Sequence, residues 1–516
     1  MKDKVLAMTA AEKTGQRFTL GFTGKTPSPE FRRLVKEYKA GNVILFRDNL
    51  ESASQARRLT GEIRNIVEGE TGHPPFIALD QEGGVVTRLP RDMVNVPGAM
   101  ALAAAGGRRE VYEAARITAG ELRRIGINLN LAPVLDVNSN PDNPAVGVRS
   151  FGTRPELAGA LGTEVIRAFA EAGLLCCGKH FPGHGDTAVD SHLDLPRVDK
   201  DLAALETCEL IPFKAAIAAG IPAIMTTHIL FPRLEERSLP ATMSRTIITG
   251  LLKEKLGFSG LVLSDGMEMK AIGDFYGVPE GCLAALGAGV DLVYICHESP
   301  QMEESLRAAA AAYNGGRFDR EEFDRSVEKI LLYKEKYASF GIDGGEEAGD
   351  FPERNAFLMR RTISLEGSAK AGSAILPPLG TRPFFTGPLA YRSTIASAKP
   401  DDALDFASWF ARRFGGEGVQ SSLNPGGEEI ESICSRAAGH SSVVLGCYNA
   451  HLNRAQIDLA KALAGLHIPL IAAALRNPYD LKLMPPRAWK LAVWEYTENS
   501  FEALAGALRG DFIPTG

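Results

Sequence analysis

Cysteine is scarce in this chain, with seven residues at irregular spacing. No two of them have the Cys-x-x-Cys spacing typical of structural zinc sites, so the sequence predicts no such site. Cys176 and Cys177 lie in an apolar run, where we expect buried thiols. Reduced cysteines are the simplest interpretation, and they favour a cytoplasmic protein.

Long apolar runs and an excess of positive charge are also absent. No run reaches the ~18 residues that a membrane span needs, and residues 1–15 lack the apolar core of a signal peptide. The chain as given therefore predicts neither a membrane partner nor export. Lys and Arg number 57 against 63 Asp and Glu, a net charge of −6. This balance argues against a nucleic-acid partner, because proteins that bind nucleic acids usually carry a basic surface.

Short apolar runs recur between helical patterns in the first 300 residues. They cover residues 18–22, 43–46, 76–80, 129–137, 174–180, 223–228, 261–265 and 292–296. Repeated strand-then-helix units favour a parallel sheet with helices outside it. Eight units predict a (β/α)8 barrel of the TIM type, with an open doubly wound sheet as the alternative.

The chain has 516 residues, enough for a second domain after the barrel. A helix over 320–340 is expected to close the barrel, and the Gly- and acid-rich stretch 341–350 is expected to be a linker. We therefore predict domains at 1–345 and 346–516. The second has strand candidates at 384–385, 443–447, 470–474 and 491–494, which predict a smaller parallel α/β sandwich.

Polar side chains follow several of the predicted barrel strands. They are Asp80, Asp136, Lys179, His180, His228 and Asp265. The C-terminal strand ends of such a barrel form its active face, so we expect these dispersed residues to meet there.

The densest polar segment is 179–192. It holds Lys179, His180, His184, Asp186, Asp190 and His192, although the whole chain has only nine His. Two Gly and a Pro keep the segment irregular, which is typical of a loop. The residue types suit acid–base work or metal binding, and a solvated polar loop is the plain alternative.

Asp190 and His192 form a compact acid–His pair within this segment. A carboxylate beside an imidazole fixes its tautomer and raises its pKa, which helps the ring donate a proton near neutral pH. The alternative is an Asp that stabilises the loop beside an incidental His.

Three further residues are candidates for chemical or binding roles. Asp265 ends a buried run and is a candidate nucleophile toward an electrophilic carbon, or else the N-cap of the next helix. Asp80 precedes a Gly-Gly pair and is able to accept hydrogen bonds from sugar hydroxyls, or to stabilise the turn. Arg149 lies in a loop of small residues and is either a ligand contact or a salt-bridged arginine.

Taken together, these segments resemble glycoside hydrolase family 3, and within it the β-N-acetylglucosaminidases of the cell-wall-recycling type. The matching pieces are DQEGGVVTR at 80–88, NLNLAPVLDV at 128–137, RSFG at 149–152, KHFPGHGDT with DSH at 179–192, and GFSGLVLSDGMEMKAI at 257–272. The resemblance covers roughly residues 15–340, and we find no comparably sharp motif after them. Gly266 departs from it, because related enzymes often carry Asp or Ala there.

The resemblance implies a role for most of these residues. Asp265 would be the nucleophile, His192 the general acid/base paired with Asp190, and Asp80, Arg149, Lys179 and His180 the sugar-binding residues. His184 and Asp186 would shape the loop that carries the acid, and His228 would either line the pocket or be a core histidine. The resemblance implies neither a metal nor an organic cofactor. The acid/base motif lies in the first domain, so we expect the second to be structural or to contribute to a rim or dimer contact.

The expected function is that of a cytoplasmic, retaining, exo-acting β-N-acetylglucosaminidase that removes terminal GlcNAc, with small peptidoglycan fragments (muropeptides) as the expected substrates. Retaining glycosidases commonly use two carboxyl groups about 5–5.5 Å apart, but here a His–Asp pair would replace the acid carboxylate. A neutral imidazole repels an incoming anion less than a carboxylate does, which leaves room for phosphate to replace water. The alternatives are therefore a β-N-acetylglucosaminide phosphorylase or a β-glucosidase of the same family, and more remotely a non-catalytic sugar-binding protein.

Overall fold

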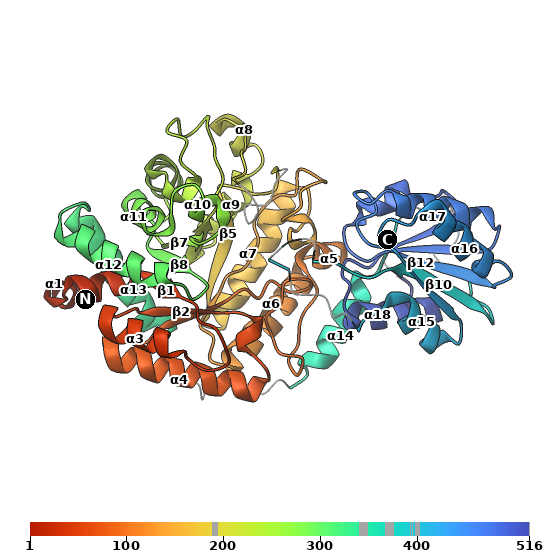
Figure 1. Cartoon of the computed structure of the whole chain (residues 1–516), viewed down its shortest axis with the longest axis horizontal. Coiled ribbons are helices and arrows are strands. Elements are labelled where there is room, and N and C mark those ends of the chain that lie inside the picture. Colours follow the sequence, from red (N-terminus) through yellow and green to blue (C-terminus); the bar gives the residue numbers. More distant parts are fainter. Residues whose placement is uncertain are drawn as a thin grey trace.

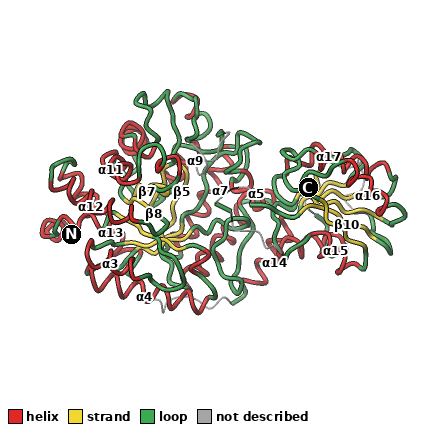
Figure 2. Tube along the Cα trace, in the orientation of Figure 1, coloured by secondary structure: helices red, strands yellow, loops and turns green. Residues whose placement is uncertain are grey.

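The computed structural model describes residues 1–187, 195–339, 349–366, 376–392, 394, 396–397 and 403–514. Two bodies lie side by side along the long axis of the molecule, a larger one built from the first part of the chain and a smaller one built from the last (Figure 1). Figure 2 shows strands at the centre of each body with helices around them.

The larger body is the predicted TIM-type barrel. Its eight strands form a closed sheet in chain order, with parallel neighbours throughout. They are β1 Phe18–Leu20, β2 Asn42–Leu45, β3 Phe76–Leu79, β4 Leu129–Asn130, β5 Leu175–Phe181, β6 Ala223–Thr226, β7 Leu261–Gly266 and β8 Leu292–Ile295. Each of the eight apolar runs became a strand. Only β4 is much shorter than its run, because Pro133 has no N–H to donate to a ladder.

Helices cover the outside of the barrel. They are α1 Lys2–Ala7, α2 Ala10–Gly15, α3 Pro29–Tyr38, α4 Ala53–Thr71, α5 Ala99–Ala104, α6 Arg108–Arg124, α7 Pro155–Glu171, α8 Leu202–Glu206, α9 Leu210–Ala218, α10 Lys270–Gly273, α11 Val278–Ala288, α12 Pro300–Asn314 and α13 Arg320–Tyr337, with a π-helix at Thr246–Lys255. Helix α7 illustrates why such segments form helices on the barrel surface. Pro155 occupies its first turn, where no N–H partner is needed, and Leu161, Ile166 and Phe169 bury one face.

The barrel strands alternate between two apolar cores. In β7, Leu261 and Leu263 belong to the cluster inside the barrel, whereas Val262 packs in the layer between the strands and the helices. Successive side chains of a strand point to opposite faces, so every second residue of each strand fills the interior.

The smaller body is a six-stranded sheet in the order β11-β10-β12-β13-β14-β9. Its strands are β9 Ser364–Glu366, β10 Pro383–Pro388, β11 Glu417–Ser421, β12 Ser442–Cys447, β13 Leu470–Ala474 and β14 Trp489–Ala492, and its helices are α14 Phe351–Thr362, α15 Phe406–Phe414, α16 Gly427–Ala437, α17 Ala455–Gly465 and α18 Glu498–Arg509. All four predicted strands are present. The sheet is parallel as predicted except at one edge, where the short β9 pairs antiparallel with β14.

Helix α14 connects the two bodies, since it packs against α6 and α5 of the barrel and against α18 of the smaller domain. The domain boundary predicted at 345/346 falls among residues outside the described ranges. All seven cysteines are free thiols, and Cys176 and Cys177 are buried as expected. Among the described residues, no helix combines the length and the apolar character that crossing a membrane requires.

Candidate active site

The period of the strands carries polar side chains to the C-terminal mouth of the barrel. Leu175 and Cys177 of β5 fill the barrel interior, and two residues further on the same face stands Lys179. Asp80 follows Phe76 and Ala78 of β3 in the same way, and Asp265 follows Leu261 and Leu263 of β7. Residues two apart on a strand share a face, so all three functional side chains belong to the interior face of the barrel.

These side chains line a cavity of about 500 Å³. Its walls include Asp80, Glu82, Arg88, Arg149, Lys179, His180, His184, Asp265, Glu268 and Lys270 from the barrel, together with Arg392, Ala396 and Ser397 from the smaller domain. The volume is in the range of small-molecule sites, and the polar groups converge on it from several strand ends. The candidate nucleophile and the four predicted sugar-binding residues therefore share one cavity, whereas Asp136 and His228, also expected at this face, are not among its lining residues.

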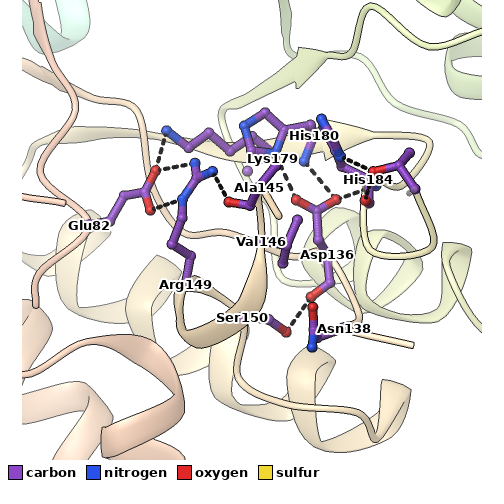
Figure 3. A network of polar contacts seen from close by, with 12 residues as sticks. Glu82, Asp136, Asn138, Ala145, Val146, Arg149, Ser150, Lys179, His180 and His184 are labelled. Atoms are coloured by element: carbon purple, nitrogen blue, oxygen red, sulfur yellow. Dashed lines mark hydrogen bonds and ion pairs between the residues drawn. The ribbon is translucent and has the colours of Figure 1, made fainter. Parts of the chain in front are cut away.

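A buried ionic network forms one wall (Figure 3). Glu82 receives two hydrogen bonds from Arg149, at 2.7 and 2.8 Å, and lies 2.7 Å from Lys179 Nζ. Lys179 also donates to Asp80 Oδ1 at 2.6 Å. The carbonyl of Ala145 accepts a further bond from Arg149 at 2.8 Å. Arg149 is thus salt-bridged as well as facing the cavity.

Burial and charge act in opposite directions on this network. Burial by itself would raise the pKa of Glu82, but the charges of Arg149 and Lys179 outweigh it and hold that pKa well below its ordinary value. Burial disfavours the charged form of Lys179, yet Asp80 and Glu82 raise its pKa on balance. The wall therefore presents fixed charges at neutral pH, with rigid donors and acceptors for sugar hydroxyls.

Asp136 organises the histidines. Its Oδ2 lies 2.7 Å from Nδ1 of His180, and its Oδ1 accepts backbone N–H bonds from His180 and His184 at 3.2 and 2.7 Å (Figure 3). Burial would raise the pKa of Asp136, but His180 and His184 lower it on balance. An ionised carboxylate only accepts hydrogen bonds, so Asp136 accepts the Nδ1 proton of His180 and fixes the orientation of the ring.

Asp265 stands partly exposed at the end of β7, and its Oδ1 accepts the N–H of Gly266 at 2.8 Å. The N-cap interpretation is wrong, since α10 starts only at Lys270 and its cap residue is Met269. Beneath it, His228 is fully buried. Its ring contacts the Thr242 hydroxyl and the Gly266 carbonyl, each at 2.9 Å. The core interpretation of His228 is therefore correct.

The loop after β5 is anchored up to Thr187. Asn143 donates to the carbonyls of His184 and Thr187, and Asp186 pairs with Lys200 at 2.9 Å. Gly185 lies so close to the Val137 carbonyl that a Cβ there would stand 1.6 Å from its oxygen. The predicted acid–His pair, Asp190 and His192, lies outside the described residues.

Sequence reasoning assigned no role to three residues that the structure brings into the site. Glu82 and Arg88 lie inside the quoted 80–88 motif, and Asp136 was noted only as a strand end. Arg88 is 6% exposed and donates to the Ala396 carbonyl at 2.8 Å, and its Nε has no hydrogen-bond partner among the described residues. The acidic side chain of Glu82 next to Asp80 in the motif is visible in the sequence. Its pairing with Arg149 and Lys179 is not, because these partners lie 67 and 97 positions further along the chain. Among the described residues, no group of three or more His, Cys, Asp or Glu is arranged to hold a metal ion.

Comparison with known proteins identifies relatives of this chain. The chain is 34% identical over 367 residues to β-hexosaminidase A of Pseudoalteromonas piscicida, a match that covers 64% of this chain and 61% of that protein. It is 35% identical over 295 residues to a β-hexosaminidase of Alkalilimnicola ehrlichii, covering 56% of this chain and 82% of the relative.

A solved structure matches nearly the whole chain. The glycoside hydrolase family 3 β-N-acetylglucosaminidase of Paenibacillus sp. str. FPU-7 superposes with a TM-score of 0.90 at 38% identity, covering 99% of this chain and 98% of that one. Residues 4–332 match the glycosyl hydrolase family 3 N-terminal domain. The chain belongs to glycosyl hydrolase family 3.

Proposed function

We propose that this chain is a retaining, exo-acting β-N-acetylglucosaminidase that removes terminal GlcNAc, with peptidoglycan-derived fragments as its natural substrates. The observation that carries the proposal is the position of Asp265, whose carboxyl group faces the same cavity as the Asp80–Lys179–Glu82–Arg149 network. A nucleophile beside a fixed set of hydroxyl-binding groups is the arrangement that glycosyl transfer to an enzyme requires.

The reaction proceeds in two steps. The network and His180 hold the terminal sugar, and Asp265 attacks its anomeric carbon while His192, supported by Asp190, protonates the leaving oxygen. The glycosidic C–O bond breaks as the bond to Asp265 forms. His192 then takes a proton from water, and that water releases the sugar with its original β configuration.

The relatives support the substrate part of the proposal. Two are named β-hexosaminidases, and the structural neighbour that spans the chain is named a β-N-acetylglucosaminidase. The match spans less than two thirds of the Pseudoalteromonas protein, so that protein as a whole is not a template for this chain. The proposal therefore also rests on the cavity.

One set of assays tests the reaction and the sugar. Hydrolysis of aryl β-GlcNAc and aryl β-glucoside is measured with and without inorganic phosphate. We expect turnover of the GlcNAc substrate, free GlcNAc as product and no requirement for phosphate. Preference for the glucoside would contradict the substrate, and GlcNAc-1-phosphate as the main product would make the enzyme a phosphorylase. No turnover of either would leave a sugar-binding protein.

The acid/base role of His192 predicts an effect that depends on the leaving group. We expect His192→Ala to lower kcat/KM roughly 10²–10⁴-fold for glycosides with poor leaving groups, which need the proton. For substrates with acidic phenol leaving groups, which depart without a proton, kcat/KM should fall far less. A uniform loss across a series of aryl glycosides of graded phenol pKa would contradict the assignment.

A further inference from the structure

The smaller domain reaches the sugar-binding wall through one buried carboxyl group. Glu495 follows strand β14 and is only 3% exposed. Its Oε1 accepts a hydrogen bond of 2.7 Å from the backbone N–H of Gly98, which belongs to the barrel. The contact joins residues 397 positions apart, so it exists only when the two domains are docked.

The same oxygen also rests against the turn that carries Glu82. A Cβ placed on Gly84 would stand 2.8 Å from Oε1 of Glu495, so only a glycine leaves room for the carboxyl group there. Gly84 has a φ of +54°, which a glycine adopts without strain. A water-sized cavity of about 10 Å³ separates Glu495 from Glu82 and Arg149. Glu495 thus contacts the turn between Glu82 and Arg88 directly.

Other parts of the smaller domain support neighbouring loops of the site. Asn477 packs against Gly147, in the turn that carries Arg149, and the Tyr479 hydroxyl accepts a bond of 2.6 Å from Asn138. The Ala396 carbonyl holds Arg88 at 2.8 Å. The cavity wall is therefore assembled against the second domain at several points, and Glu495 is the one ionisable carboxyl group among these contacts.

The charge of Glu495 is poorly compensated. Among the described residues no Lys, Arg or His forms an ion pair with its carboxylate, and Arg149, which lines the same small cavity, is engaged by Glu82. Burial raises the pKa of Glu495 to about 7, although the Gly98 N–H and the Thr497 hydroxyl lower it somewhat. An ionised carboxylate without a cation is costly in such a place, so the docked arrangement favours the protonated form.

We propose that Glu495 is a positioning residue through which the second domain holds the sugar-binding turn 80–88, most firmly when its carboxyl group is protonated. The consequence rests on the proposed function. Substrate binding should weaken as pH rises through neutrality, whereas this titration should not change the rate of the chemical step at Asp265.

The test compares Glu495→Gln and Glu495→Ala with the wild type across pH 5.5–8.5. Gln keeps an acceptor for the Gly98 N–H but does not titrate. We expect its KM for aryl β-GlcNAc to equal that of the wild type at pH 5.5 and to be several-fold lower at pH 8.5, with kcat unchanged. Ala loses the acceptor, so its KM should be raised roughly tenfold at every pH. Glu498→Gln, an exposed carboxyl group three residues later, is the matched control.

Amide hydrogen exchange supplies a readout that needs no turnover. Peptides covering residues 80–98 should exchange faster in Glu495→Ala than in the wild type at the same pH, and Glu495→Gln should restore their protection. If the wild type shows no turnover but the variants show this exchange pattern, the proposed function is contradicted while the positioning role of Glu495 is supported. The positioning role fails if the KM ratio of wild type to Glu495→Gln is the same at every pH, or if Glu495→Ala leaves both KM and exchange unchanged.

Discussion

Replacing Asp265 by Ala should lower kcat for aryl β-GlcNAc by about 10⁴-fold or more, because no other group would form the glycosyl-enzyme bond. The fold should persist, since this side chain is partly exposed at the end of β7. Thermal unfolding and steady-state kinetics on the same preparation check both parts.

Two further measurements sharpen this result. Azide added to the Asp265→Ala variant should restore turnover of a substrate with a good leaving group, and the product should be the α-glycosyl azide, because only one displacement occurs. Asp274→Asn, an exposed carboxylate nine residues later, should behave as wild type. Activity of Asp265→Ala within roughly tenfold of wild type would contradict the nucleophile assignment.

The second large effect is expected at Glu82. Glu82→Gln removes a carboxylate that both Arg149 and Lys179 contact, and it leaves buried cations without full compensation. Breaking a buried pair in this way costs about 3–5 kcal/mol. We expect a loss of that order in the free energy of unfolding, together with a higher KM, because the hydroxyl-binding groups lose their common anchor. Denaturant unfolding and kinetics measure the two effects.

The pH dependence of this loss has a definite sign. The pKa of Glu82 is lower in the folded protein than its ordinary value of 4.5, so its stabilisation is fully present above about pH 4.5 and is lost as pH falls below that value. The difference in the free energy of unfolding between wild type and Glu82→Gln should therefore be constant from pH 6 to 8 and become smaller in acid.

Two comparisons separate the network from general destabilisation. Combining Glu82→Gln with Lys179→Met should destabilise less than the sum of the single changes, because removing the cation relieves the uncompensated charge. Glu62→Gln, at an exposed pair with Arg32, should cost under about 1 kcal/mol. Strict additivity of the double variant would contradict the network.

Much of the barrel is predictable from local pattern. Runs such as 261–265 alternate between two apolar environments, and that period is a property of the strand itself. The same period places Asp80, Lys179 and Asp265 on the interior face at strand ends. The short edge strand β9 was missed because three residues carry too little pattern, and its pairing with β14 is a long-range contact.

By itself, the sequence determined which residue types stand at the ends of which strands, and so where Asp80, Lys179 and Asp265 face. Only the tertiary structure decided how their charges are compensated. Glu82, which follows β3, pairs with Lys179 of β5 and with Arg149 of a loop. The Asp136 carboxylate orients His180, and the carboxyl group of Glu495 comes from the second domain. The physical reason is that strand period is local, whereas ion pairing and desolvation depend on groups that only the closed barrel and the docked second domain bring together.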